Sequence, residues 1–199
     1  MKMMMVVCIT VLCAFGVCAQ SMDDSIERGI ALHDRALAEG EETALKCRET
    51  LEPFIEKNMV ARAYYGSVIT IQASFYADEN PVHSLTLLEE GAQYMDSAVS
   101  NDPDNGELRL IRLSNGIEVS RSSPLKRYAV IADDVRWFEK HPLPSSPEDC
   151  AAILLNCGLY YLDAGDMDAA LDALETCVES GAETAAVQNA RDILRRYEE

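Results

Sequence analysis

Motifs of the common enzyme classes are missing from this sequence. It has no G-x-S-x-G nucleophile motif, no P-loop and no Rossmann glycine pattern. The histidines, His33, His83 and His141, lie far apart, and none has a Cys or His three or four residues further on, as a metal site on a helix needs. We expect His33 and His141 to be surface residues. These absences predict a protein that is not an enzyme and that binds neither a cofactor nor a metal.

Basic residues are scarce as well. The chain has 17 Lys and Arg against 34 Asp and Glu, a formal net charge of −17 at pH 7. Such a charge repels nucleic acid and anionic lipid, which excludes these partners. It favours solvated helix faces, and a basic partner is the alternative.

Strand-like alternation of polar and apolar residues is absent, and helical periodicity dominates. We predict an all-α chain of about eight or nine helices. Pro53 predicts a break near residues 50–52. The expected helices span 24–39, 41–57, 59–76, 81–100, 106–119, 124–140, 147–164 and 167–179, with a last one from Gly181 to the C-terminus. On that last helix, Arg191, Arg195 and Arg196 are expected on the outer face, and Ile193 and Tyr197 on the inner face.

Capping residues support these boundaries. Asn58 can cap the third helix, and Asp104 with Glu107 forms a capping pair for the fifth. Ser146 reads as the cap of the seventh helix, with Asp149 as its capping partner and a proline at the first helical position.

The N-terminus has the three-part pattern of a secretory signal peptide. Lys2 supplies positive charge, residues 3–15 are apolar, and Val17 and Ala19 occupy the two positions that signal peptidase reads. The apolar run is shorter than the about 20 residues that span a bilayer, which disfavours an uncleaved anchor. We predict cleavage after Ala19 and a periplasmic or secreted protein with no integral membrane segment. Lipid anchoring at Cys18 is disfavoured because a small residue does not precede it.

Cleavage would leave four cysteines, Cys47, Cys150, Cys157 and Cys177. An even number in an oxidising compartment allows two disulfides. No C-x-x-C occurs among them, so neither a zinc knuckle nor a thioredoxin-type site is supported.

Residues 151–182 carry a repeat-like pattern of small and large residues. Its positions are Leu154, Cys157, Gly158, Tyr161, Gly165, Ala170, Leu174 and Cys177. This pattern resembles the tetratricopeptide (TPR) repeat, a hairpin of two antiparallel helices. Small residues such as Gly158 and Ala170 let the helices approach closely, and large ones such as Tyr161 and Leu174 fill the space beside the crossing. Cys157 and Cys177 stand at medium or small apolar positions, so they are either buried thiols or, alternatively, a disulfide.

A divergent repeat precedes it at about residues 59–103. Gly91, Met95, Ala98 and Pro103 resemble the second half of the pattern, whereas Gly66 and Ala73 compete for the small position of the first half. The stretch GAQYMDSAVSNDPDNGELRLIRL, within residues 61–141, also resembles small exported bacterial proteins. This second resemblance supports the fold and implies nothing about chemistry.

The TPR resemblance implies one domain over residues 20–199, built of hairpins stacked as a short right-handed solenoid or a compact bundle. It implies a scaffold that binds an unidentified protein or peptide on a groove lined by the first helix of each hairpin. The residues expected at such a groove are Arg109, Arg112, Tyr65, Trp137, Leu155, Leu159, Leu162 and Asp163.

Two alternatives stay open at this point. Arg109 and Arg112 lie one turn apart and could bind a peptide carboxylate, or they could pair with Glu107 or with acids on a neighbouring helix. The whole chain could instead be a small-ligand carrier or transporter accessory protein. Its cavity would then lie near the aromatic residues Tyr64, Tyr65, Tyr160 and Trp137.

Overall fold

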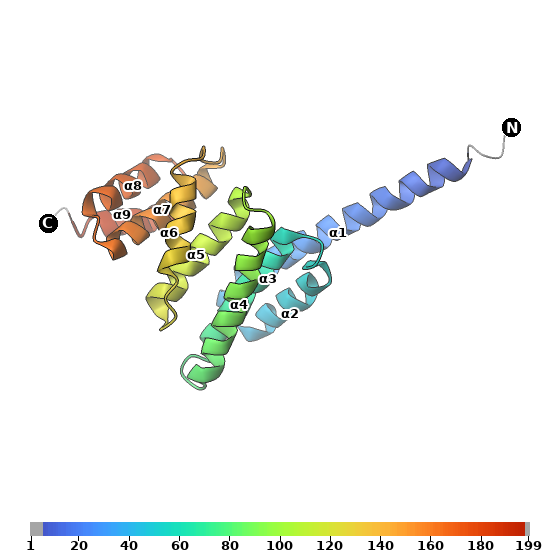
Figure 1. Cartoon of the computed structure of the whole chain (residues 1–199), viewed down its shortest axis with the longest axis horizontal. Coiled ribbons are helices and arrows are strands. Elements are labelled where there is room, and N and C mark those ends of the chain that lie inside the picture. The colour runs from blue at the N-terminus through green and yellow to red at the C-terminus, as the bar shows by residue number, and fades with distance from the viewer. Residues whose placement is uncertain (1–5, 198–199) are drawn as a thin grey trace. The chain divides into compact units, whose positions relative to one another are not determined.

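The computed structural model describes the backbone of residues 6–197 and the side chains of residues 22–197. Nine α-helices and one 3₁₀ turn make up the regular structure of this part of the chain, which contains no strand (Figure 1). The elements are α1 Val6–Glu39, α2 Glu41–Leu51, η1 Glu52–Phe54, α3 Met59–Phe75, α4 Pro81–Asn101, α5 Gly106–Ser122, α6 Tyr128–Phe138, α7 Pro147–Ala164, α8 Met167–Glu179 and α9 Ala185–Leu194. The prediction of an all-α chain with eight or nine helices is confirmed.

Several helix boundaries differ from those expected. The first helix begins at Val6, so it contains the predicted cleavage point, and cleavage itself stays a prediction. The break predicted near residues 50–52 is confirmed: the second helix ends at Leu51, because Pro53, which has no backbone N–H, leads the chain into a 3₁₀ turn. The sixth begins at Tyr128, since Ser123 is extended and the backbone N–H of Arg127 bonds to the Ser120 hydroxyl rather than continuing a helix.

The chain divides into two compact units, Met1–Tyr94 and Met95–Glu199, with the boundary inside α4. No helix in the described part of the chain is both long and apolar enough to cross a membrane. In the first unit, α1, α2 and α3 pack against one another. Glycines mark the closest helix approaches there: a Cβ at Gly29 would lie 2.3 Å from Leu51 Cδ2, and a Cβ at Gly91 would lie 2.4 Å from the carbonyl oxygen of Gly66.

The second unit contains the hairpins α5–α6 and α7–α8, followed by α9. Helix α7 packs against α5 and α9 as well as against its partner α8. Two apolar clusters hold these helices, one from Leu113, Ile117, Ile131, Val135, Phe138, Ile153, Cys157 and Ala173, the other from Ala151, Leu174, Cys177, Ala182, Val187 and Ala190.

The predicted hairpin at residues 151–182 has the expected geometry at its crossing. A Cβ at Gly158 would lie 2.7 Å from Leu174 Cγ and 3.4 Å from the Ala170 carbonyl oxygen, so only a residue without a side chain fits there. Gly165 ends α7 with a left-handed φ of 81°, which glycine adopts without strain. Membership of the TPR family stays a prediction.

His33 is not the surface residue that its sequence context predicts. Its side chain is 18% exposed and lies in the first unit, edge-on to the Tyr64 ring. Its Nε2 lies 2.9 Å from Ser67 Oγ, and its Nδ1 lies 3.1 Å from Asp34 Oδ1. Burial lowers the pKa of His33, and the hydrogen bond and charge of Asp34 only partly oppose this effect.

We therefore expect stability to fall as the pH drops below about 6.5, the usual pKa of histidine in an unfolded chain. Over that range the unfolded state binds a proton that the folded state binds only at lower pH, so protonation favours unfolding. Urea unfolding at pH 7 and pH 5.5 measures the change. In His33→Gln, which does not titrate, the loss between these pH values should be smaller than in the wild type. An equal loss in both proteins would rule out His33 as its source.

Candidate functional site, a groove on α5, α7 and α9

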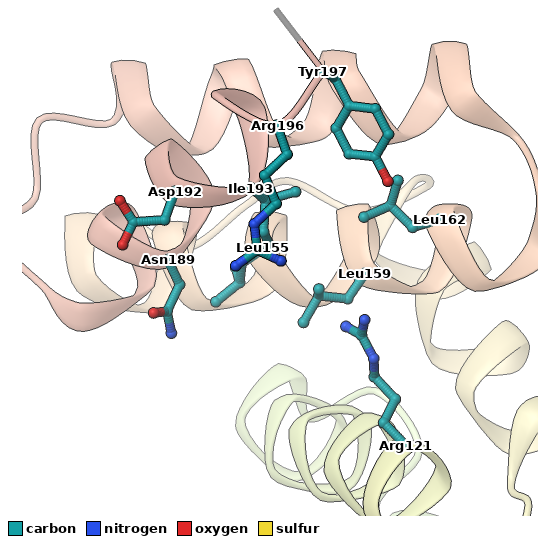
Figure 2. Close-up of a pocket in the computed structure, with 9 residues that line it drawn as sticks. All are labelled: Arg121, Leu155, Leu159, Leu162, Asn189, Asp192, Ile193, Arg196 and Tyr197. Carbon is teal, nitrogen blue, oxygen red and sulfur yellow. The ribbon is translucent and has the colours of Figure 1, made fainter. Parts of the chain in front are cut away.

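A pocket of about 380 Å³ opens on the second unit between three alternate helices. Its floor is apolar and its rim is polar (Figure 2). The lining residues are Arg121 from α5, Leu155, Leu159 and Leu162 from α7, and Asn189, Asp192, Ile193, Arg196 and Tyr197 from α9 and the turn after it. We call this pocket the α7 groove.

Helical spacing explains the leucine floor. Leu155, Leu159 and Leu162 recur at intervals of four and three, so they lie along one face of α7. Leu159 packs at the edge of the cluster shared by α5 and α6, and Leu155 and Leu162 pack at the edge of the cluster shared by α8 and α9. All three leucines stay half-buried, so they present apolar surface to solvent between the two cores.

The end of α9 brings a basic and an apolar side chain onto the same face. The N–H groups of Arg196 and Tyr197 donate to the carbonyls of Ile193 and Leu194, three residues earlier, which is 3₁₀ geometry. Residues three apart eclipse in such a turn, so Arg196 stands over Ile193. Arg196 is exposed, as expected for the outer face, and Ile193 packs at the edge of the apolar cluster of α8 and α9, as expected for the inner face. Tyr197, expected on the inner face, is 49% exposed, and all three side chains line the α7 groove.

The charges around the groove are unevenly neutralised. Arg121 Nε lies 3.8 Å from Asp163 Oδ2, a long ion pair. Asp192 accepts a hydrogen bond of 2.9 Å from Arg195, on the solvent side. Arg196 forms no ion pair with any residue between 22 and 197. The groove therefore presents two guanidinium groups and one carboxylate that is already paired.

The predicted groove residues separate into those that meet here and those that do not. Leu155, Leu159 and Leu162 line the groove. Asp163 does not line it but forms the long ion pair with Arg121, which does. Tyr65 belongs to the first unit, where it is 5% exposed. Its hydroxyl accepts a 3.2 Å hydrogen bond from Arg48, so it is a core residue there.

Arg109 and Arg112 are not available to a ligand, because both are buried in ion pairs. Arg112 donates from Nε and Nη2 to the two carboxylate oxygens of Asp134 at 2.8 and 2.6 Å, and Arg109 Nη1 donates to Asp134 Oδ1 at 2.9 Å. Asp134 is fully buried, and burial raises its pKa against the opposing effect of the two arginines. Asp133 at the surface joins both pairs, so the pairing alternative is the arrangement observed.

Trp137 covers this ion-pair network rather than a ligand cavity. The guanidinium carbon of Arg109 lies 5.1 Å from the Trp137 ring centre, within the range of a cation–π contact. His141 stacks on the same indole with centroids 3.9 Å apart. The Trp137 ring is thus engaged by residues of its own unit.

All four cysteines between residues 22 and 197 are free thiols. Of the two alternatives for Cys157 and Cys177, buried thiols are the arrangement observed, and the two side chains belong to different apolar clusters. Cys177 Sγ donates to the carbonyl oxygen of Ala151 at 3.3 Å. Burial raises the pKa of Cys157 to about 12, so this thiol is protonated and unreactive at neutral pH.

Sequence reasoning missed most of the groove's polar rim. Arg121, Asn189 and Asp192 lie on helices whose contacts with α7 are set by tertiary packing. The available signal is the basic cluster near the C-terminus, which the helical pattern predicts to face solvent. Comparison of the chain with protein-family models, curated proteins and solved structures finds no match in any of the three. The groove itself is therefore the basis for assigning a function.

Proposed function

We propose that this chain is a non-enzymatic peptide-binding module of the cell envelope and that its ligand occupies the α7 groove. The observation that supports this most is the row of half-exposed leucines between two guanidinium groups. Leucines left at a concave surface gain free energy when a partner side chain covers them, at about 25 cal/mol per Å² of apolar area buried. Polar groups around such an apolar floor orient the ligand.

The packing order of the second unit supports a TPR-like scaffold within this proposal. The hairpins α5–α6 and α7–α8 place α5 and α7 together, and α9 follows on the other side of α7. The residues that line the groove come from α5, α7 and α9 with the turn after it, which are alternate helices of this unit, and this supports the proposal. The cell-envelope location rests on the signal-like N-terminus alone.

An open groove favours a peptide over an enclosed small ligand. The rim residues Arg121, Asn189, Arg196 and Tyr197 are exposed, so a bound chain can continue beyond the groove into solvent. The volume of about 380 Å³ is at the low end for ligand pockets, which suits one or two side chains of a longer partner.

Selection from a random-peptide phage library tests this proposal. The immobilised full-length protein should enrich a peptide family, and Tyr197→Ala and Leu159→Asp should reduce the retained phage at least tenfold. Leu143→Asp is the matched control, because Leu143 is an exposed leucine outside the groove. Circular dichroism verifies that each variant is folded, and Tyr197→Ala keeps the test valid if Leu159→Asp unfolds, since Tyr197 is 49% exposed. Failure to enrich any family above an empty support would refute the proposal.

A further inference from the structure

Two arginines from different helices line the α7 groove together with its leucines. Figure 2 shows Arg121 reaching from α5 toward Leu159, and Arg196 extending from the end of α9 toward Ile193 and Leu155. The contact of Arg121 with Asp163 that defines their ion pair, from Nε to Oδ2, is 3.8 Å long and exceeds hydrogen-bond distance, so Asp163 holds the guanidinium group only weakly. Arg196 adds a second planar donor set.

This local charge is opposite in sign to that of the whole molecule. The chain has a net charge of −17, yet the groove is lined by two cations and one carboxylate, Asp192, that Arg195 already binds, and Asp163 at the edge lies 3.8 Å from Arg121. Guanidinium groups bind carboxylates through paired hydrogen bonds that are shorter and stronger than those between neutral groups. Charge complementarity therefore favours an anionic carboxylate as the group that meets Arg121 and Arg196.

The arginines lie close to the leucine floor, and this favours the C-terminal residue of a peptide over an internal acidic residue as the group that is bound. In an extended peptide, neighbouring side chains point to opposite faces, so an internal acid and the apolar residue next to it cannot both enter one small groove. At a C-terminal residue, the carboxylate and the side chain branch from the same Cα. A single residue can then place its carboxylate on the arginines and its apolar side chain on the leucines.

We infer that the α7 groove recognises the C-terminal residue of a partner protein, an apolar residue with a free carboxylate. Arg121 and Arg196 bind the carboxylate, and Leu155, Leu159 and Ile193 contact the side chain. The preceding residues of the partner leave across the open rim. This inference rests on the proposed peptide-binding function and adds the chemical identity of the ligand.

Two arrays of random hexapeptides, linked through their N-termini, test this inference. One array has free C-terminal carboxylates and the other has C-terminal amides. We expect the full-length protein to bind peptides of the free-acid array that end in an apolar residue, and the amides to bind at least about tenfold more weakly, because charge-assisted hydrogen bonds are lost. Equal binding to both arrays would overturn the inference and leave the peptide-binding function standing, whereas no binding to either would overturn both.

Charge-reversal variants locate the binding of the free-acid peptides. Arg196→Glu should reduce affinity at least tenfold, and Arg191→Glu, on α9 five residues earlier and outside the groove, should leave it within about twofold. Equal losses would show that the chain's overall charge, rather than the groove, governs binding, and would overturn the inference. Laurate tests the rival ligand, a fatty acid. If the protein binds laurate and binds no peptide, the groove is a fatty-acid site and the inference is refuted.

Discussion

Asp134→Ala should lower the free energy of unfolding by about 3–5 kcal/mol, the usual cost of removing one member of a buried ion pair. Asp134 is fully buried and accepts hydrogen bonds from both Arg109 and Arg112, which are themselves 8% and 7% exposed. Removing the carboxylate leaves two guanidinium groups in the protein interior with too few acceptors. Urea unfolding of the full chain, followed by circular dichroism, measures the loss.

Asp133→Ala is the matched control for this experiment. Asp133 contacts the same two arginines, at 3.2 and 3.4 Å, but its side chain is 57% exposed. Water compensates for a lost exposed partner, so we expect a change of no more than about 1 kcal/mol. If the two neighbouring alanine variants lost equal stability, burial of the ion pair would not be the cause.

Gly91→Ala should destabilise the first unit by roughly 1–3 kcal/mol, although alanine favours helix by about 1 kcal/mol over glycine. The new Cβ would lie 2.4 Å from the backbone oxygen of Gly66 and 2.6 Å from Thr70 Cγ2. A side chain can change rotamer, but a helix carbonyl cannot, so α3 and α4 must separate there. The loss of packing then outweighs the gain in helix propensity.

Gly106→Ala is the corresponding control. The nearest atom to a Cβ at Gly106 is Trp137 Cη2 at 3.5 Å, an ordinary contact. We expect this variant to be as stable as the wild type or slightly more stable. Thermal unfolding of both variants measures the difference, and equal midpoints would contradict a close helix crossing at Gly91.

Local signals in the sequence explain why the helices could be predicted. Asn58 accepts from the Ala61 N–H and Ser146 from the Asp149 N–H, both as expected for N-caps. The fifth helix differs: Asn105, not Asp104, is its cap and accepts from the N–H groups of the next two and three residues. Caps act over one turn, so sequence reveals them to within a residue.

The groove was only half predictable, for a physical reason. Leu155, Leu159 and Leu162 share one face of one helix, and that relation follows from a period of 3.6 residues. Arg121 and Arg196 reach them from two other helices, and their positions depend on how α5 and α9 pack on α7. Arg109 and Arg121 are both arginines of α5, and the sequence alone does not tell them apart. Arg109 is buried because Asp134 lies beside it in the folded protein, whereas Arg121 is exposed.

The Asp134 network also has a mechanical consequence. Two helices that meet through apolar side chains can shift along each other, because apolar contacts have no preferred direction. The guanidinium groups here bind one carboxylate in one orientation, so they do not allow such a shift. Asp96 on α4 joins the network through Arg112, whose Nη1 lies 3.6 Å from Asp96 Oδ1, and it also accepts a 2.6 Å hydrogen bond from Arg127. These ion pairs hold α5 and α6 in a single register, so we expect any widening of the groove for a ligand to occur at the contacts that α7 makes with α5 and α9.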